Sequence, residues 1–421
     1  NFDDEFYKLH NYLEGVFPLI HSSLEKKVFN QSLLYKWTGT DKKLKPILLM
    51  SHLDVVPVDL STLNEWDAPP FSGNIKNGNT IYSMVRFGNV LKSSGSVVPL
   101  FKKQIKEARK NRKKIGWQNY EATVPEFIGN KLINNIKISE ISDYIDWTPF
   151  FQTWELKGRY PKLFEDKLVG KVAKELYQDA LDMLKLITTN NLLKPQAIIG
   201  FYKANSKNEE IKIYDKENNL INIFIFLRQQ LKKSKKIQNL CLSDFIAPSN
   251  FKIDDYIGFF AVTIKNNYSS NYELDLKNDD YNSIMFRALS DRLAEALAEK
   301  THLEVRKSFW GYSKNEKFTS NDLIKEKYRG IRPAPGYPAC PDHSHKKDIL
   351  DLLDAKKMIG IDLTENFAMT PLSSVAGFYF NHPESSYFGV SNIAEDQLKT
   401  YADINKIPLT RARKLFSEII E

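Results

Sequence analysis

The run RPAPGYPACP, from Arg332 to Pro341, holds residue types well suited to binding a small polar molecule. Its four prolines fix φ and lack backbone donors, so we expect an ordered loop and not a helix or a central strand. Arg332 can bind a carboxylate through two parallel hydrogen bonds, and the ring of Tyr337, next to Gly336, can lie against a positive centre. The run therefore predicts a ligand-binding loop, although its composition is also typical of a rigid surface connector.

Residue types that bind metals follow in the same stretch. Cys340, His343 and His345 have a C-x-x-H-x-H spacing, which suggests zinc. A complete zinc site needs a fourth ligand and a closed geometry, and the spacing supplies neither. A zinc site at this loop therefore stays an alternative to a structural role for these three residues.

A second candidate site lies near the start of the chain. His52 and Asp54 follow the apolar run 47–50, which predicts a buried strand, and open α/β sheets place their sites just beyond strand ends. With the following EWDAPPFSG, this pattern resembles the first metal-binding segment of the zinc aminoacylase and carboxypeptidase family, which implies that His52 is a zinc ligand and that Asp54 orients it. That family next needs a bridging carboxylate, but no aspartate occurs between Asp67 and Asp143. We expect a non-functional remnant of a metal site in an incomplete α/β fragment.

The remaining chain groups its predicted strands in the middle and its helices around them. Strands are expected at 136–147, 196–205 and 255–264, as a hairpin over 211–230, and as two antiparallel strands within 363–390. Helices are expected at 5–30, where Pro18 is a candidate for a break or restart, at 167–187, 280–306 and 346–358, and from Glu395 onward. This order predicts an α+β fold with a central antiparallel sheet flanked by helices. The absence of a G-x-G-x-x-G motif argues against a dinucleotide-binding unit.

These elements carry several residues that have a plain structural interpretation. Asp146 precedes TPFFQTWEL and is a good helix cap, while Tyr387 and Phe388 fall in a predicted strand, where aromatic residues commonly pack in the core. Glu295 lies off the apolar stripe of the long helix, where a solvated side chain is expected. That stripe comprises Ile284, Ala288, Leu289, Leu293, Ala296 and Leu297. Glu209 and Glu210 lie in a segment that looks like a polar turn between strands.

Composition and charge exclude several classes of protein. The 421 residues are 42% hydrophobic, which is typical of a globular chain, and no stretch is apolar enough to span a membrane. The net charge of +8 is only weak evidence for nucleic-acid binding, because much of the excess lies in the run 102–114. That run predicts a solvated helix or linker, or a docking surface for an acidic partner. Cys241 and Cys340 make no disulfide framework, and the acidic start NFDDEF is no signal peptide, so we expect a cytoplasmic protein. Because the chain begins without Met, we also expect that an upstream part is missing.

The segment GIRPAPGYPACPDH resembles the S-adenosylmethionine-binding loop in the C-terminal activation module of cobalamin-dependent methionine synthase. Other segments resemble the same module in the same order, and the resemblance covers about residues 96–421. They are YIDWTPFFQTWELKGRYP at 144–161, LCLSDFIAP at 240–248, DDYNSIMFRALSDRLAEALAE at 279–299, LTENFAMTP at 363–371 and NHPESSYFGV at 381–390.

The resemblance implies a function and a set of S-adenosylmethionine-binding residues. These are Asp146, Glu295, Arg332, Ala334, Gly336, Tyr337, Tyr387 and Phe388. The module would supply the methyl group of S-adenosylmethionine for the reductive reactivation of cobalamin, which is bound by a partner module and reduced by flavodoxin or a similar electron donor. The chain would thus be part of a methyltransferase of methionine biosynthesis, with no catalytic side chain or metal of its own, and without a D-x-H-x-x-G stretch it is not expected to make methionine alone.

The two resemblances together predict the domain organisation. Residues 1–83 are a truncated fragment similar to zinc peptidases, 84–114 a junction and basic linker, and 115–421 the S-adenosylmethionine-binding activation domain. A zinc-dependent metallopeptidase is the alternative function. A non-catalytic module that binds acidic proteins or RNA through 102–114 is a third, for which a steep salt dependence of binding would be the evidence.

Overall fold

The computed structural model describes residues 2–16, 18–29, 32–36, 75–76, 79–80, 104–231, 237–269, 278–417 and 419–420. The chain divides into two compact units, 1–99 and 100–421. The first contains α1 (Phe2–Val16), α2 (Pro18–Ser23), the hairpin of β1 (Glu25–Phe29) and β2 (Ser32–Lys36), and the short pair β3 (Ile75–Lys76) and β4 (Asn79–Thr80). The helix predicted over 5–30 is therefore correct only as far as Ser23. His52, Asp54 and the strand predicted at 47–50 lie outside the described residues.

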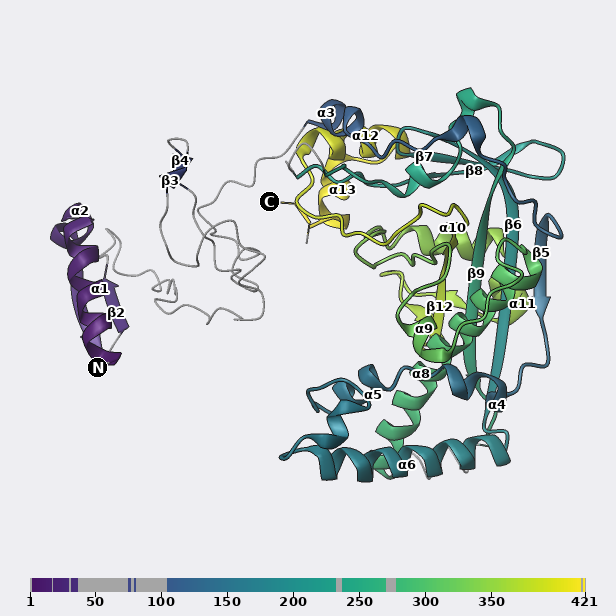
Figure 1. The fold of residues 1–421 in the computed structure, drawn as a ribbon, viewed down its shortest axis with the longest axis horizontal. Helices are drawn as coiled ribbons and strands as arrows, with labels where there is room; N and C mark the ends of the chain where they lie inside the picture. The colour runs from purple at the N-terminus through teal and green to yellow at the C-terminus, as the bar shows by residue number, and fades with distance from the viewer. Residues whose placement is uncertain are drawn as a thin grey trace. The chain divides into compact units, whose positions relative to one another are not determined.

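The second unit is built on a six-stranded antiparallel sheet (Figure 1), which confirms the predicted α+β fold. Its order is β12-β9-β6-β7-β8, and β5 also pairs with β6. The strands are β5 (Gly129–Ile133), β6 (Leu193–Lys207), β7 (Glu210–Tyr214), β8 (Leu220–Ile225), β9 (Asp255–Asn266) and β12 (Ser374–Tyr379). The predicted hairpin is β7 and β8, joined across the DKENN turn.

Both faces of this sheet are covered by helices, which explains why its central strands are apolar throughout. On β6, Ile199 and Phe201 face one core, and Ile198 and Tyr202 face the other. The helices are α3 (Ile105–Lys110), α4 (Ile138–Ile141), α5 (Trp147–Thr153), α6 (Gly170–Thr189), α8 (Asp280–Glu304), α9 (Ser320–Ile324), α10 (His345–Leu352), α11 (Ala355–Ile359), α12 (Glu395–Asn405) and α13 (Leu409–Leu415). None of the helices in the described ranges is long and apolar enough to cross a bilayer.

The long helix α8 packs along the sheet and carries most of the predicted stripe into the core. Asp279 caps its start by accepting a hydrogen bond from the amide of Asn282 at 3.0 Å. Leu289, Leu293 and Leu297 are fully buried, as predicted. Ile284, however, is 46% exposed, because the buried face at this end of α8 runs through Met285 and Phe286 instead.

Three further expectations differ from the structure. The segment 136–147 was expected to be extended, but it holds the one-turn helix α4 and a 3-10 turn at Ser142–Tyr144, because its isoleucines pack against α8. Tyr387 and Phe388 lie in a loop that follows β12. Between Leu363 and β12 the chain forms only the short strand β11 (Met369–Thr370), which pairs with β10 (Asp362–Leu363).

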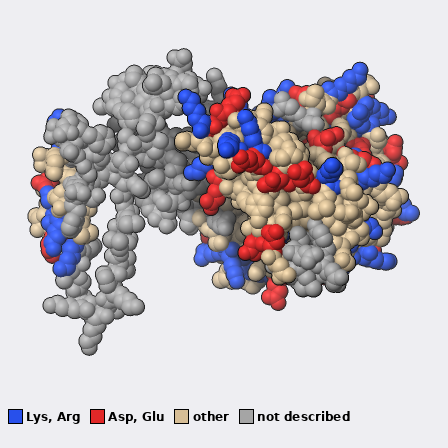
Figure 2. All heavy atoms as spheres, turned by 90° about the horizontal axis from the view of Figure 1, so that it is seen from below, with Lys and Arg blue, Asp and Glu red and all other residues tan. Residues whose placement is uncertain are grey.

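The basic run is also more deeply integrated than a solvated linker. Within α3, Ile105 and Ala108 are buried, and the backbone amide of Ile105 donates to Asp396 of α12, which lies beside it (Figure 1). Residues 105–110 therefore belong with the folded unit, while the predicted limits at 83 and 115 stay predictions. On the face shown in Figure 2, basic and acidic side chains of this unit are mixed and form no single basic patch.

Candidate functional site

A cavity of about 430 Å³ opens where the proline-rich loop meets α8, β9 and β12. This volume is in the range of small-molecule sites. Six of the residues singled out in the sequence line it, and they come from three separate segments of the chain. They are Glu295, Arg332, Ala334, Tyr337, Tyr387 and Phe388.

The loop is ordered, as predicted, and Gly336 sets its turn. Gly336 has φ of +96°, a conformation that a residue with a side chain rarely adopts, and a Cβ there would lie 2.4 Å from the ring of His343. Its amide donates to the carbonyl of Cys340 at 2.7 Å, and the Cys340 amide donates to Tyr337 at 2.9 Å. Gly336 therefore shapes the loop and is not part of the cavity lining.

The start of the loop is held against β12. The amide of Phe378 donates to the carbonyl of Pro333 at 3.0 Å, and Ile331 and Phe380 exchange two backbone hydrogen bonds. The approach is so close that a Cβ on Gly377 would lie 2.6 Å from the Pro333 carbonyl oxygen. The absence of a side chain at Gly377 is thus a condition for the observed position of the loop.

We predict that Gly377→Ala lowers the free energy of unfolding by about 1–3 kcal/mol, because the new methyl group must push the loop away from β12. Urea denaturation followed by tryptophan fluorescence measures this change. Gly389→Ala is the matched control, since a Cβ there meets only the Pro338 side chain at 3.7 Å, an ordinary contact. Equal stability of the two variants would contradict the prediction.

Arg332 is the best-defined polar group of the cavity. Its Nη1 donates to Glu299 at 2.5 Å and to the Tyr328 hydroxyl at 3.0 Å, and its backbone amide donates to the Tyr387 hydroxyl at 3.0 Å. Burial is the largest single influence and lowers the pKa of the guanidinium, but Glu299, Tyr328 and Tyr387 together outweigh burial, so the net pKa is raised. Its Nε and Nη2 make no hydrogen bond with any residue in the described part of the chain. This Nε–Nη2 edge of the guanidinium can bind a carboxylate in bidentate geometry.

Two acids and one tyrosine complete the polar lining. The Tyr337 hydroxyl lies 3.5 Å from Glu295 Oε1, and Glu295, with burial as the second cause, raises the pKa of Tyr337. Glu326 also lines the cavity, and burial raises its pKa against the lowering effect of Arg332. The cavity thus combines carboxylates and one guanidinium with the apolar walls of Phe260 and Val375, which suits a ligand with both kinds of charge and an apolar part.

Asp146 is the helix cap that its sequence predicts. Its Oδ1 accepts a hydrogen bond from the amide of Thr148 at 3.0 Å at the start of α5. Among the described residues, Asp146 is not part of the cavity lining, although α5 packs against α8, the helix that carries Glu295. Contact of Asp146 with a ligand therefore stays a prediction.

The Cys340, His343 and His345 spacing gains no support as a metal site. Among the described residues, no group of three or more histidine, cysteine, aspartate or glutamate residues could hold a metal ion. Burial raises the pKa of the Cys340 thiol, and Nε2 of His345 lies 3.0 Å from the carbonyl of Ile225.

Sequence reasoning missed several residues that shape the cavity. The most important is Glu299, which is buried and anchors Arg332 although it does not line the cavity itself. It follows Glu295 by four residues and so lies on the same face of α8, which is the one sequence signal that could have indicated it. Tyr328, Glu326, Phe260 and Val375 carried no such signal.

Comparisons with known proteins agree with this geometry. A family model described as "Vitamin B12 dependent methionine synthase, activation domain" matches residues 137–406. A solved structure, "Crystal Structure of the MetH Reactivation Domain bound to AdoHcy", is 42% identical, with a TM-score of 0.71, over 76% of this chain and 98% of that one.

The amino-terminal segment gives a different result from the one expected. A model described as "Polysaccharide biosynthesis protein" matches residues 38–111, where a zinc aminoacylase-like fragment was expected. The expectation rested on a His-x-Asp pair and a short following motif, and such fragments out of context are weak evidence. For the rest of the chain the match is long and consistent with the fold, so the chain belongs to the family of activation domains of vitamin B12-dependent methionine synthase.

Proposed function

We propose that this chain binds S-adenosylmethionine and supplies its methyl group for the reductive reactivation of cobalamin in methionine synthase. The observation that carries the proposal is the free Nε–Nη2 edge of Arg332 in a ligand-sized cavity of a chain from this family. The solved relative was bound to AdoHcy. AdoHcy is S-adenosylhomocysteine, the compound that S-adenosylmethionine becomes after losing its methyl group. The chain acts as one module of a methyltransferase of methionine biosynthesis and does not make methionine alone.

The cavity residues suggest how the ligand lies. Arg332 binds the carboxylate of the ligand through Nε and Nη2, while Glu295 and Asp146 attract its ammonium. Ala334 and Tyr337 surround the sulfonium and its methyl group, where the Tyr337 ring can face the positive sulfur. Tyr387 and Phe388 border the adenosine, since an aromatic face stacks well on a purine. Gly336 contributes through the turn that it allows.

The chemistry needs little from these side chains besides orientation. Cobalamin, bound by a partner module and reduced by one electron from flavodoxin or a similar donor, would supply the nucleophile for the methyl group. The carbon–sulfur bond breaks, and the thioether sulfur keeps the electron pair and leaves as part of AdoHcy. The chain holds the sulfonium methyl at the cavity mouth and so contributes proximity and alignment.

Calorimetric titration of the whole chain with S-adenosylmethionine tests the proposal. We expect saturable binding at one site and competition by S-adenosylhomocysteine. Binding should persist after treatment with a zinc chelator, because no step of the proposed function uses zinc. Absence of binding by a well-folded chain would contradict the proposal.

A further inference from the structure

Four side chains of alternating charge contact one another in sequence, and the last of them lines the cavity. Glu316 pairs with Arg306 at 2.8 Å, Arg306 lies 3.9 Å from Glu299, and Glu299 pairs with Arg332 at 2.5 Å. Their side chains are 2%, 0%, 9% and 19% exposed in that order, so only Arg332 approaches solvent. Because charges interact strongly where water is excluded, these four groups act on one another more than surface pairs do.

Tyr328 connects the two arginines by a second route. The guanidinium of Arg306 lies over the ring of Tyr328, 4.0 Å from its centroid, while the hydroxyl of the same tyrosine accepts a hydrogen bond from Arg332 Nη1. Nη1 of Arg332 is thereby held by two acceptors, Glu299 and Tyr328, and both of these contact Arg306. The position of Arg306 thus helps to orient the free edge of Arg332.

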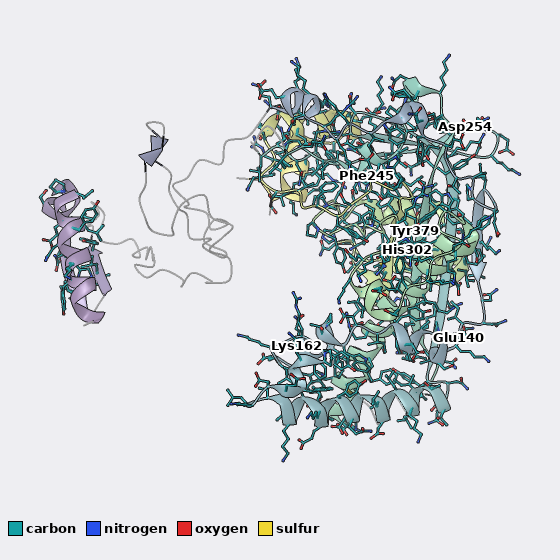
Figure 3. All side chains as sticks on the ribbon, viewed as in Figure 1. Glu140, Lys162, Phe245, Asp254, His302 and Tyr379 are labelled. Atoms are coloured by element: carbon teal, nitrogen blue, oxygen red, sulfur yellow. The ribbon has the colours of Figure 1, made fainter. Side chains whose placement is uncertain are left out.

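The carboxylate of Glu299 is shared between the two arginines. Its Oε2 accepts from Arg332, while its Oε1 makes no hydrogen bond and faces Nη1 of Arg306, which makes none either. The neighbouring His302 adds no positive charge here, since burial, together with Arg306 and Arg332, lowers its pKa well below its usual value and keeps it neutral. His302 instead stacks on Tyr379, beside which it lies in Figure 3. Arg306 therefore draws part of the negative field of Glu299 away from Arg332.

We propose that Arg306 and Glu316 are positioning residues for the ligand carboxylate, which they never touch: they hold Glu299 and Tyr328 so that the Nε–Nη2 edge of Arg332 stays free and positively charged. The inference rests on the proposed function. A bound ligand carboxylate adds a negative charge next to Arg332, so the series of alternating charges then has five groups. Without Arg306, the full charge of Glu299 acts on Arg332 alone and weakens its attraction for the ligand.

Two ligands that differ only in the carboxylate provide the test, namely S-adenosylmethionine and its decarboxylated form. Arg306→Met/Glu316→Met removes a buried charge pair as a unit, a change that proteins often tolerate because no single buried charge is left behind. We expect this variant to bind S-adenosylmethionine about tenfold more weakly than the parent chain does. Its affinity for the decarboxylated ligand should stay within about twofold, because that ligand makes no contact with the free edge of Arg332.

Two controls separate positioning from general damage. Lys300→Met/Glu304→Met removes an ion pair from the same helix that does not lead to Arg332, and it should leave both affinities unchanged. In a chain that already carries Arg332→Gln, the change at Arg306 and Glu316 should cause no further loss of affinity, since nothing remains to be positioned. If the double methionine variant does not fold, the single Arg306→Gln variant is judged by the same ratio of the two affinities.

The outcomes are distinct. An equal loss for both ligands, or no loss for either, overturns the positioning role and leaves the proposed function standing. If the parent chain binds both ligands equally well, Arg332 does not bind the ligand carboxylate, and the inference is overturned too. A well-folded parent that binds neither ligand refutes the proposed function, and the inference with it.

Discussion

Arg332→Ala should lower the affinity for S-adenosylmethionine by a factor of about 30 to several thousand. Removing one partner of a buried, hydrogen-bonded charge pair costs about 2–5 kcal/mol, and each 1.4 kcal/mol is a factor of about ten in affinity. The Arg332 side chain is only 19% exposed, and its guanidinium is already oriented by Glu299 and Tyr328, so little entropy is lost when it binds the ligand. Calorimetric titration of parent and variant measures the effect.

The alanine variant also leaves Glu299 buried without its partner, so a matched change is needed to distinguish binding from stability. Arg332→Lys keeps a positive charge opposite Glu299 but lacks the planar fork. We expect it to be nearly as stable as the parent and yet to bind S-adenosylmethionine clearly more weakly. An Arg332→Ala variant that binds as tightly as the parent would remove Arg332 from the site.

The sequence was most informative where long segments have one consistent pattern. The strands β6 and β9 and the helices α6 and α8 were predicted because their apolar residues recur over ten or more positions. The prediction of short elements failed because a single helical turn has too few residues to show a hydrophobic period. Thus α4, a helix of four residues, was mistaken for part of a strand.

The residues of the candidate site also divide into those that the sequence predicted and those that it did not. Its loop was found because the prolines, Arg332 and Tyr337 are conspicuous in sequence. The other predicted lining residues were expected because of the resemblance to the activation module, and they are Glu295, Ala334, Tyr387 and Phe388. The groups that hold Arg332 in place were missed, since Glu299, Arg306 and Glu316 look like the solvated face of a helix and its following turn. Only tertiary contacts bury them, and no local sequence pattern indicates those contacts. The same holds for Glu209, which does lie in the predicted turn between β6 and β7 but points inward and is 5% exposed.

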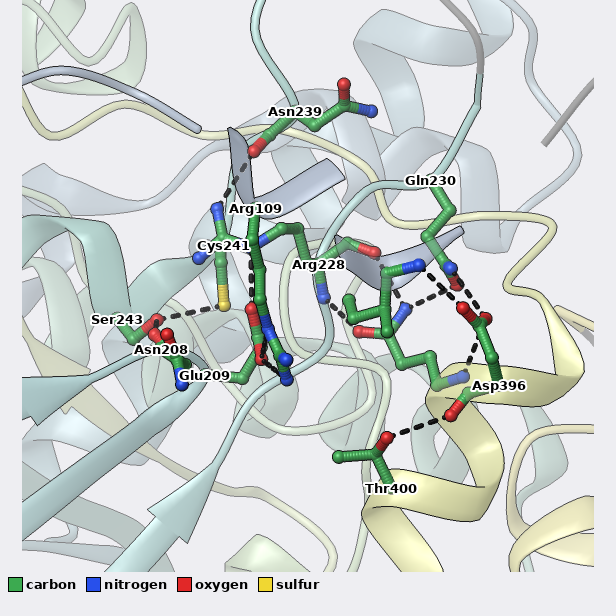
Figure 4. A network of polar contacts seen from close by, with 12 residues as sticks. Arg109, Asn208, Glu209, Arg228, Gln230, Asn239, Cys241, Ser243, Asp396 and Thr400 are labelled. Atoms are coloured by element: carbon green, nitrogen blue, oxygen red, sulfur yellow. Dashed lines mark hydrogen bonds and ion pairs between the residues drawn. The ribbon is translucent and has the colours of Figure 1, made fainter. Parts of the chain in front are cut away.

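Figure 4 shows the network in which Glu209 takes part, and Arg228 is its centre. The Arg228 side chain is fully buried. Its Nε donates to Glu209 at 2.7 Å, and its two Nη atoms donate to Asp244 at 2.7 and 2.8 Å. Its backbone exchanges hydrogen bonds with Gln397 of α12 at 2.7 and 3.0 Å. Arg228 therefore joins the turn before β7, the segment around Asp244 and α12.

We predict that Arg228→Met lowers the free energy of unfolding by about 3–5 kcal/mol, because it leaves Asp244 and part of Glu209 as buried carboxylates without a counter-charge. Arg109→Met is the matched control. Arg109 also pairs with Glu209, at 2.6 Å, but its side chain is 28% exposed. Its loss should cost clearly less than the loss of Arg228, since the Arg109 side chain is partly exposed and Arg228 still bonds to Glu209. Urea denaturation of both variants decides the matter.

Similar losses in the two variants would mean that the network is no more than a set of independent ion pairs. A loss confined to Arg228 would mean that the unit depends on one buried cation to join segments far apart in sequence. The second result is expected because the carboxylates of Glu209 and Asp244 lie on different segments. Among the side chains that the structure describes, only that of Arg228 bonds to both of them at less than 3 Å. A buried charge cluster of this kind has no low-energy arrangement without its shared partner.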